Sequence, residues 1–371
     1  MRFFATCKLG LESTVAFQLK TLGMRDVSAE DARVFFTGGF SDMCRALVWL
    51  RTAERLLLEV ASFPAETFEA LYEGTKAVRW TDYLSRDARI HVNGKSAKSR
   101  LFSVSDCQSI VKKAIVDDLA RAYRVSALPE TGREVIVEVG LLRDTATLAL
   151  DCCGAGLSRR GYRTYNVSAP LSETLGAAIV LLSRYRAERP LIDPMCGSGT
   201  MPIEAAMIAQ NRAPGLFRAF AAEEWPFVPQ ETWRDARDEA RSAATNAPVD
   251  ILGSDIDARS IDVSKQHAKK AGVMVNWAVR PLSELSTDKH GGVLVVNPPY
   301  GERLMDRRST ETLYRDMRRV FAPLSDWSVN VLAASGEFEK FYGRRADKRR
   351  KLSNGGMPCT LYQYFGEKRD G

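Results

Sequence analysis

Hydrophobic and polar positions in the first 60 residues switch repeatedly between strand-like and helix-like spacing. Short apolar runs at residues 3–7, 34–40 and 56–63 predict strands. Residues 11–23 carry apolar side chains at helical spacing and end on a glycine, and residues 41–50 predict a helix with Ser41 as its N-cap. Strands and helices mixed in so short a stretch favour a small α+β domain.

A second unit follows, in which basic residues accompany the predicted elements. Residues 89–103 carry a strand and then several lysines and arginines, and residues 103–125 predict a long helix. Residues 135–153 predict a hairpin of two strands turning at Arg143-Asp144. The pattern changes near residue 166, where a helix over 168–185 is expected, so we predict domains at 1–60, 61–165 and 166–371.

From residue 190 onward, short apolar runs alternate with helical patterns. Strands are expected at 190–193, 250–257, 291–300 and 328–335, with helices at 201–211 and 258–272. This alternation predicts an α/β fold with a doubly wound parallel sheet. Ligands of such sheets bind at the carboxyl ends of the strands.

Composition excludes several classes of protein. The 371 residues are 45% hydrophobic and 27% charged, which is typical of a soluble globular protein, and no apolar run is long enough to cross a membrane. The first residues lack the features of a secretory signal, and the seven cysteines include no Cys-x-x-Cys pair. We therefore expect reduced thiols and a cytoplasmic location. Three scattered histidines predict no metal site.

The net charge of +7 is unevenly distributed along the chain. Residues 76–165 contain 16 basic and 10 acidic side chains, and residues 340–371 contain 9 and 3. Each region thus carries +6, and the remainder is acidic. Two basic regions of this kind favour a surface that binds a polyanion such as nucleic acid, although solvated charge alone is an alternative.

A glycine-rich turn, DPMCGSGT at residues 193–200, joins the first predicted strand of the α/β unit to its helix. Gly197 and Gly199 allow the backbone to approach a ligand, and the following helix offers unpaired N–H groups. The turn lacks the Gly-Lys-Ser/Thr of nucleotide-triphosphate loops and the full dinucleotide fingerprint. Helix packing is the alternative explanation of its glycines.

Asp255 ends the next predicted strand and is a candidate for binding both hydroxyls of a ribose. It lies 62 residues after Asp193, far beyond the roughly 20 residues of a simple nucleotide-binding unit. Residues 213–243 are therefore interpreted as an inserted excursion. Asp255 could instead cap the following helix, a role for which Asp257 competes.

The strand VLVV at 293–296 runs into Asn297-Pro298-Pro299-Tyr300. Proline cannot continue a central strand, so the chain must leave the sheet rigidly at Asn297. The Asn297 amide oxygen and the Pro298 carbonyl are two acceptors that suit an exocyclic amine, and Tyr300 suits stacking on a base. A plain Asn-Pro turn is the alternative.

Together the two motifs resemble the class I S-adenosylmethionine-dependent methyltransferases that modify amino groups. The segments at 99–101, 108–115, 157–163 and 213–216 are similar to those of bacterial THUMP-domain RNA methyltransferases, above all the guanine-N2 methyltransferases of 23S ribosomal RNA. The resemblance implies a ferredoxin-like domain at 1–60, a THUMP domain at 61–165 and a Rossmann-like methyltransferase domain at 166–371. It implies S-adenosylmethionine as cofactor and RNA as partner.

The same resemblance implies roles for individual residues. Catalysis would fall to Asn297, Pro298 and Tyr300. The expected cofactor contacts are Asp193, Pro194, Cys196, Gly197, Gly199, Thr200, Asp255 and Ile256. The expected RNA contacts are Lys95, Lys98, Arg100, Lys112, Lys113, Arg159, Arg160 and Arg163.

One departure from the family concerns the adenine of the cofactor. Arg280-Pro281 stands where an acidic adenine contact is common, and Glu284 is the candidate substitute. Two alternatives stay open: a DNA adenine-N6 or protein glutamine methyltransferase that uses the same acceptor pair, and a non-enzymatic RNA-binding factor of ribosome assembly.

Overall fold

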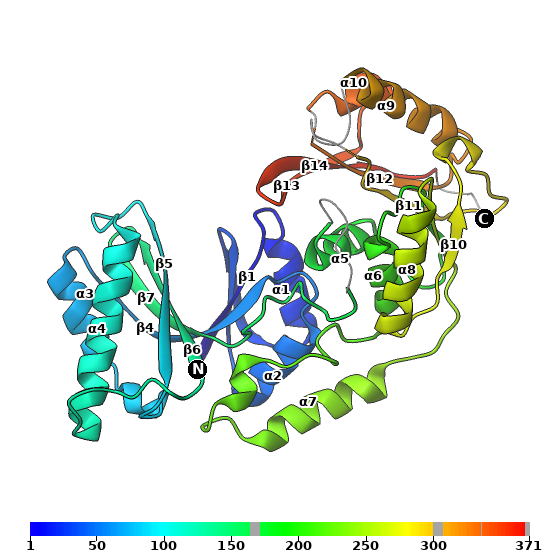
Figure 1. Ribbon diagram of the computed structural model, residues 1–371. Coiled ribbons are helices and arrows are strands. Elements are labelled where there is room, and N and C mark those ends of the chain that lie inside the picture. The colour runs from blue at the N-terminus through cyan, green and yellow to red at the C-terminus, as the bar shows by residue number, and fades with distance from the viewer. Residues whose placement is uncertain (164–170, 300–306, 335, 368–371) are drawn as a thin grey trace.

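The computed structural model describes residues 1–163, 171–299, 307–334 and 336–367. Two seven-stranded sheets, one from each half of the chain, form the framework of the protein (Figure 1). The predicted domain boundary near residue 166 lies outside the described residues. No helix in the described ranges is both long and apolar enough to span a membrane.

The first sheet is continuous across both predicted N-terminal units. Its order is β2-β3-β1-β4-β7-β6-β5, and only β5 and β6 are parallel neighbours. Its strands are β1 (Arg2–Thr6), β2 (Arg25–Glu30), β3 (Arg33–Thr37), β4 (Arg55–Pro64), β5 (Arg89–Ala97), β6 (Glu134–Leu142) and β7 (Thr145–Asp151). Strand β4 passes through the predicted limit at residue 60, so the two units share it.

Helices pack on one face of this sheet. They are α1 (Glu12–Thr21), α2 (Phe40–Trp49), α3 (Phe68–Lys76) and α4 (Val104–Tyr123). Because side chains alternate along a strand, Phe3 enters the core beneath the helices while Phe4 points to the opposite face. There Phe4 and Phe35 form a small apolar cluster, and the guanidinium groups of Arg33 and Arg2 lie over their rings.

The prediction that Ser41 caps the second helix is wrong. Helix α2 already begins at Phe40, and Gly39 occupies the N-cap position. The Asp42 carboxylate accepts a hydrogen bond from the Gly39 backbone N–H at 2.8 Å. An acceptor three residues inside the helix therefore satisfies this N–H, which makes a capping hydroxyl unnecessary.

The second sheet has the order β10-β9-β8-β11-β12-β14-β13. Its strands are β8 (Leu191–Asp193), β9 (Ile251–Asp255), β10 (Asn276–Val279), β11 (Val293–Val296), β12 (Ser328–Ala333), β13 (Lys348–Asn354) and β14 (Met357–Tyr364). The first five strands in chain order are parallel, which confirms the predicted α/β architecture. Strands β13 and β14 form an antiparallel hairpin that was not predicted.

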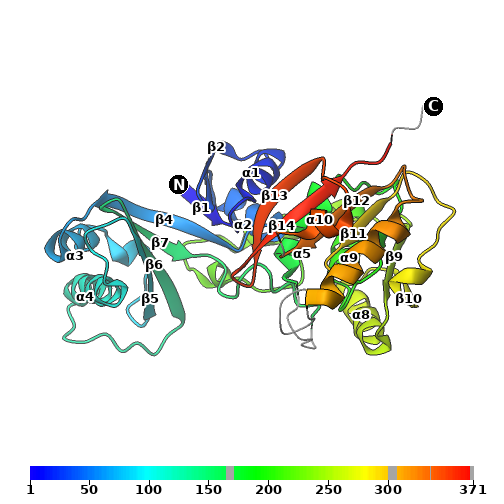
Figure 2. The ribbon, with the colours of Figure 1, turned by 90° about the horizontal axis from the view of Figure 1, so that it is seen from above.

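Helices cover this sheet as expected for a doubly wound fold (Figures 1 and 2). The predicted helices appear as α5 (Glu173–Leu182), α6 (Thr200–Ala209) and α8 (Ala258–Ala271). Helices α9 (Arg307–Phe321) and α10 (Phe338–Tyr342) were not predicted.

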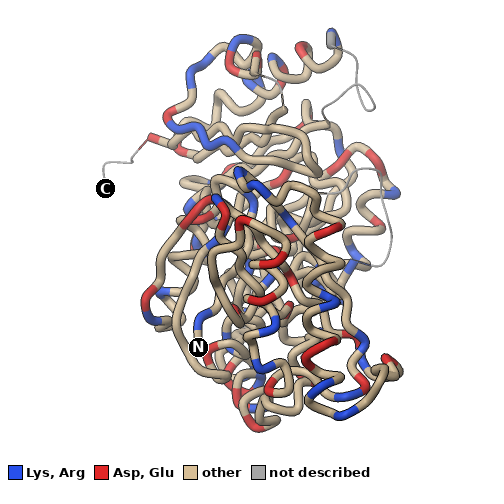
Figure 3. The backbone as a smooth tube through the Cα atoms, turned by 90° about the vertical axis from the view of Figure 1, so that its left-hand side faces the viewer, with Lys and Arg blue, Asp and Glu red and all other residues tan. Residues whose placement is uncertain are grey.

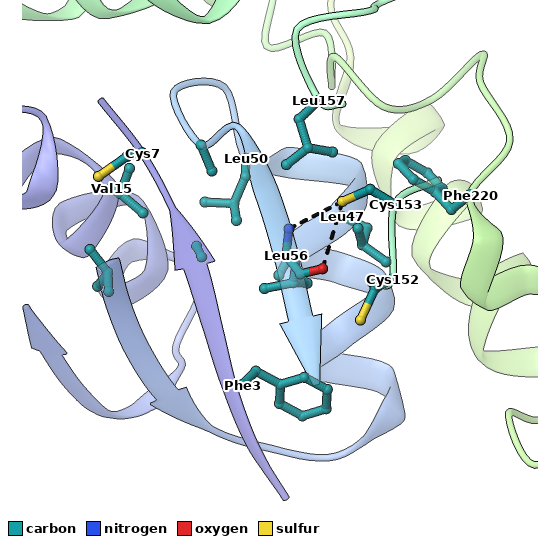
Figure 4. Close-up of a cluster of buried hydrophobic side chains, with 14 of the residues drawn as sticks. Phe3, Cys7, Val15, Leu47, Leu50, Leu56, Cys152, Cys153, Leu157 and Phe220 are labelled. Atoms are coloured by element: carbon teal, nitrogen blue, oxygen red, sulfur yellow. Dashed lines mark hydrogen bonds between the residues drawn. The ribbon is translucent and has the colours of Figure 1, made fainter. Parts of the chain in front are cut away.

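The inserted excursion joins the two halves of the protein. It contains α7 (Gln230–Ala243), which lies along α2, and Arg45 of α2 forms an ion pair with Glu239 at 2.7 Å. The Gly215 N–H donates to the Val48 carbonyl at 2.9 Å. Phe220 and Leu157 enter the core of the ferredoxin-like half, by which we mean the unit of residues 1–60 (Figure 4). All seven cysteines are buried free thiols, and Cys153 accepts a hydrogen bond from the Leu56 N–H in this core.

Candidate functional site

The carboxyl ends of three neighbouring strands bring the predicted site residues together. Strand β8 lies between β9 and β11 in the sheet. Asp193 and Asp255 are the last residues of β8 and β9, and Asn297 follows the last residue of β11. The three side chains, which lie up to 104 positions apart in the sequence, therefore share one edge of the sheet.

The glycine-rich turn adopts a conformation that favours glycine. Gly197 has φ +52° and Gly199 has φ +80°, both in the left-handed region. A Cβ atom at Gly199 would lie 2.7 Å from Trp277 and 2.9 Å from the Ser264 hydroxyl, so this glycine serves packing. A Cβ atom at Gly197 would meet no atom within 4 Å. Gly197 thus faces open space, where a ligand can approach the backbone.

Asp255 ties this turn to the end of β9. One carboxylate oxygen accepts from the Gly197 N–H at 2.9 Å, and the other accepts from the Asp257 N–H at 3.0 Å. Asp257 is the N-cap of α8, because its carboxylate accepts from the N–H groups of Arg259 and Ser260. The alternative in which Asp255 caps α8 is therefore excluded, and its carboxylate stays at the strand end.

Asp193 is a buried carboxylate with an unused acceptor. One oxygen accepts from the Met195 N–H at 3.1 Å, and the other has no hydrogen-bond partner among the described residues and is shielded from solvent. Burial raises the pKa of Asp193 well above its ordinary value, and the nearby Asp255 charge raises it further. A cationic group of a ligand would stabilise the ionised form of Asp193, so the turn fits a ligand that carries positive charge.

The remaining predicted cofactor residues lie around the same turn. Pro194 and Cys196 are buried, and the Cys196 N–H donates to the Ser254 carbonyl at 2.9 Å. The Thr200 hydroxyl accepts from Arg163 at 2.6 Å. Ile256 is 74% exposed beside Asp255.

Asn297 presents an unused acceptor at the end of β11. Its Oδ1 atom is shielded from solvent and has no hydrogen-bond partner within the described ranges. Pro298 is buried beside it, so the backbone leaves the sheet rigidly. An unpaired buried acceptor costs free energy unless a donor from a ligand reaches it. Tyr300, predicted to stack on a base, lies outside the described residues.

Strand β10, the neighbour of β9, ends at Val279, just before Arg280-Pro281, where the sequence departs from the family pattern. The Arg280 N–H donates to the Asp255 carbonyl at 3.0 Å, and two nitrogens of its guanidinium are buried without hydrogen-bond partners in the part of the chain that the structure describes. Glu284 lies in a short 3₁₀ turn (Leu282–Glu284) and is exposed. The sequence also missed Ser264, whose hydroxyl donates to the Gly197 carbonyl at 2.8 Å; a helix residue 67 positions away gives no local signal of this contact.

The predicted RNA-binding residues separate into exposed and buried groups. Lys95, Lys98 and Arg100 are exposed at the end of β5, as is Arg159 after β7. On α4, Lys113 is exposed and Lys112 forms an ion pair with Glu130 at 3.1 Å. These six residues remain candidates for RNA contact.

Arg160 and Arg163 lie elsewhere. The prediction that Arg160 contacts RNA is wrong: its side chain is 2% exposed, and it forms an ion pair with the buried Glu204 of α6 at 3.4 Å. Arg163 is mostly buried and donates to Thr200 and to the Leu171 carbonyl. Both side chains therefore hold the segment after β7 against the C-terminal half of the protein, and an RNA role for Arg163 is not supported.

A separate groove of about 910 Å³ lies between the two N-terminal units. Its lining includes basic side chains of the second unit, Lys95, Lys98 and Arg143, and also the acidic Glu30 and Glu54. The glycine-rich turn and Asn297 do not contribute to it. The groove is therefore distinct from the site at the strand ends.

Comparison with known protein families covers both halves of the chain. Residues 160–363 match the RMKL-like methyltransferase domain, residues 2–57 match the RlmL ferredoxin-like domain, and residues 65–151 match the THUMP domain. The methyltransferase match includes the glycine-rich turn, Asp255 and Asn297.

Individual relatives match over nearly the whole chain. YpsC of Bacillus subtilis, a candidate RNA methyltransferase, is 43% identical over 98% of this chain and 96% of its own. A predicted N6-adenine-specific DNA methylase from Listeria monocytogenes is 46% identical, with a TM-score of 0.93 over 99% of this chain and 96% of its own. SMU.472, a candidate methyltransferase crystallised with SAH, is 41% identical, with a TM-score of 0.93 over 99% and 98%.

Proposed function

We propose, from the premise that this chain belongs to the RMKL-like methyltransferase family, that it methylates the N2 amine of a guanine in 23S ribosomal RNA. The general activity follows from the family: the protein is an S-adenosylmethionine-dependent RNA methyltransferase. The guanine and the ribosomal target are the proposal. The observation that carries it is the unpaired, shielded Oδ1 of Asn297 at the strand edge that also holds the glycine-rich turn.

The residues present fit the cofactor. When bound, S-adenosylmethionine supplies an electrophilic methyl group on a positively charged sulfur. Gly197 offers an open approach to the backbone, and the unpaired Asp193 oxygen suits the positive charge of the methionine moiety. Asp255 is placed to receive ribose hydroxyls, and the exposed Ile256 to cover the adenine. Assignment of these residues to the cofactor is part of the proposal.

Asn297 and Pro298 would act on the target amine. The lone pair of guanine N2 is delocalised into the ring, so this nitrogen is a weak nucleophile. Two acceptors, the Asn297 Oδ1 and the Pro298 carbonyl, would bind its two N–H groups and stabilise the positive charge that develops on the nitrogen during transfer. Because prolines fix the backbone, the acceptors are held in place before the substrate arrives. We extend the proposal to Tyr300 as the stacking partner of the base.

The exposed basic residues would hold the RNA. A guanine inside a helix cannot reach the strand ends, so the target must be single-stranded or flipped out, at a cost of a few kcal/mol. Phosphate contacts from Lys95, Lys98 and Arg100, together with Lys113 on α4, would offset that cost. Binding of this kind weakens as salt concentration rises.

Transfer of a tritiated methyl group from labelled cofactor to unmodified 23S ribosomal RNA tests the proposal. The wild type should label the RNA, and nucleoside analysis should find N2-methylguanosine. Asn297→Ala should lower the rate at least about 100-fold, as expected when one transition-state acceptor is lost. Its cofactor affinity, measured by calorimetry, should remain unchanged.

Asn276→Ala provides the matched control, because Asn276 is an exposed asparagine on β10 of the same sheet. It should retain full activity. Full activity of Asn297→Ala would remove this residue from the mechanism. Label found as N6-methyladenine in competing DNA would replace the guanine proposal with the DNA methylase alternative, and label on a glutamine side chain would favour a protein substrate.

A further inference from the structure

The β13–β14 hairpin reaches the same edge of the sheet as Asn297. Val296, the residue before Asn297, pairs with Val331 of β12; the next residue of β12, Leu332, pairs with Leu361 of β14. Leu361 in turn pairs with Arg350 of β13. Arg350 is therefore level with Asn297, three strands away, or about 14 Å at roughly 4.8 Å per strand.

Strand β13 carries a dense run of positive charge. Five of the seven residues from 345 to 351 are lysine or arginine. In Figure 3 basic residues follow one another along part of this stretch, which also contains the acidic Asp347. Arg349 pairs with Glu339 at 2.9 Å. Lys348 and Lys351 are exposed and form no ion pair in the described part of the chain, and Arg345 is exposed near the Glu339 carboxylate.

The hairpin is held firmly against the ferredoxin-like half. Arg350 donates to the Gly10 carbonyl at 2.6 Å and lies 3.2 Å from the Ser13 hydroxyl. Gly10 packs so closely against the Lys351 carbonyl that a side chain at Gly10 would collide with it. Figure 2 shows β13 lying between β14 and the elements that begin the chain.

The contacts with the loop at Gly10 help to explain the positive charge on β13. Lysines on an edge strand often prevent pairing between sheets of different molecules. Here the loop at Gly10 already covers the edge near Lys351, so such protection does not account for five charges. The charges instead form a fixed cationic strip along β13, in which Lys351 is level with Pro298 and Lys348 with Val295, within reach of a short single-stranded segment.

We propose that strand β13 binds the phosphate backbone of the RNA next to the target nucleotide, through Lys348, Lys351 and the preceding Arg345. This inference rests on the proposed function and adds to it a second RNA-binding surface, within the methyltransferase domain itself. The RNA then crosses the carboxyl end of β12 and the amino end of β14 between its phosphate contacts and Asn297.

Lys348→Gln/Lys351→Gln tests the inference in the full-length protein. Affinity for a 23S ribosomal RNA transcript is measured over a range of salt concentrations. Removal of two phosphate contacts to single-stranded RNA should lower the slope of log affinity against log salt by about 1.4. The KM for RNA should rise about fivefold or more at low salt, while kcat and the affinity for cofactor stay unchanged.

Lys269→Gln/Lys270→Gln is the matched control. It removes two exposed lysines from the last turn of α8, at the opposite edge of the sheet, and should change neither slope nor KM. Lys348→Arg/Lys351→Arg should bind RNA as the wild type does, which separates a loss of charge from a loss of folding. An unchanged slope in the Gln variant, an equal fall in the control, or no RNA binding by the wild type overturns the inference.

The two proposals fail in different ways. If the wild type binds the transcript with the expected slope but labels no guanine, the proposed reaction is wrong and the phosphate surface stands. If guanine is labelled and the Gln variant binds RNA normally, the reaction stands and the phosphate surface is wrong.

Discussion

At the scale of single residues, Gly197 offers the sharpest test of the proposed cofactor site. Gly197→Ala keeps the N–H that donates to Asp255 and adds a methyl group in the open space at the turn. The left-handed φ makes alanine cost about 1–2 kcal/mol in stability. Affinity for S-adenosylmethionine should fall at least about tenfold beyond that effect, because a Cβ blocks close approach to the backbone.

Gly291→Ala is the control for this prediction. Gly291 also has a left-handed φ, +62°, and a Cβ atom there would meet nothing within 4 Å, but it precedes β11 at the other end of the sheet. It should lose similar stability and keep its affinity for the cofactor. Equal affinities of the two variants, measured by titration calorimetry, would show that Gly197 does not border the cofactor.

Residues at strand ends were predictable, and buried charges were not. The positions of Asp193, Asp255 and Asn297 follow from chain topology, since parallel strands place their carboxyl ends at one edge. Arg160 was misassigned because its basic neighbours in the sequence suggested a surface. The partner that buries it, Glu204, lies 44 residues away, on a helix whose packing no local pattern reveals.

At the scale of elements, the Arg160–Glu204 pair holds α6 against the segment after β7. Arg160 also donates to the carbonyls of Leu157 and Arg51, and the Tyr162 hydroxyl donates to Glu204 at 3.1 Å. Glu204→Ala leaves Arg160 charged and buried without a counter-ion. The free energy of unfolding should fall by about 3–5 kcal/mol, measured by urea denaturation.

Two further variants make this prediction decisive. Glu224→Ala removes an exposed ion pair with Arg133 and should cost less than about 1 kcal/mol. Arg160→Met/Glu204→Met replaces both charges and should recover much of the loss. A loss below about 1 kcal/mol in Glu204→Ala would mean that Arg160 gains access to water.

The β13–β14 hairpin shows why some elements escape sequence analysis. Its first strand, KRRKLSN, lacks the alternation of apolar and polar residues that marks a half-buried strand, because only Leu352 is buried. Strand β10 escaped detection for a similar reason: none of its four residues is fully buried. By contrast, VLVV of β11 is buried throughout and was predicted correctly.

At the scale of the whole molecule, buried thiols should make the protein less stable at high pH. Burial raises the pKa of Cys44 to about 11 and that of Cys359 to about 11. In the unfolded chain a thiol ionises near pH 8.5, roughly the value of a free cysteine. Between about pH 8.5 and 11 the unfolded state therefore binds fewer protons, and stability falls as pH rises, by about 1.4 kcal/mol per pH unit for each thiol.

Urea denaturation from about pH 8 to 10.5 measures this slope. Cys44→Ala/Cys359→Ala removes two of the contributing groups, so its stability should depend less steeply on pH, whatever its stability at the start of that range. The slope is the relevant readout, since loss of packing shifts all values together. A slope equal to that of the wild type would show that these thiols ionise alike in both states.

The ties between the halves have a consequence for target choice. Arg45–Glu239, Gly215–Val48 and Arg350–Gly10 join the methyltransferase domain to the ferredoxin-like half at separate places along the chain. Because the two halves are joined in this way, the distance between Asn297 and the proposed RNA-binding residues Lys95, Lys98 and Arg100 is fixed. Under the proposed function, this fixed distance would select a guanine by its offset from the RNA structure that the N-terminal units bind. A transcript with nucleotides inserted between the two would then place the wrong base at Asn297.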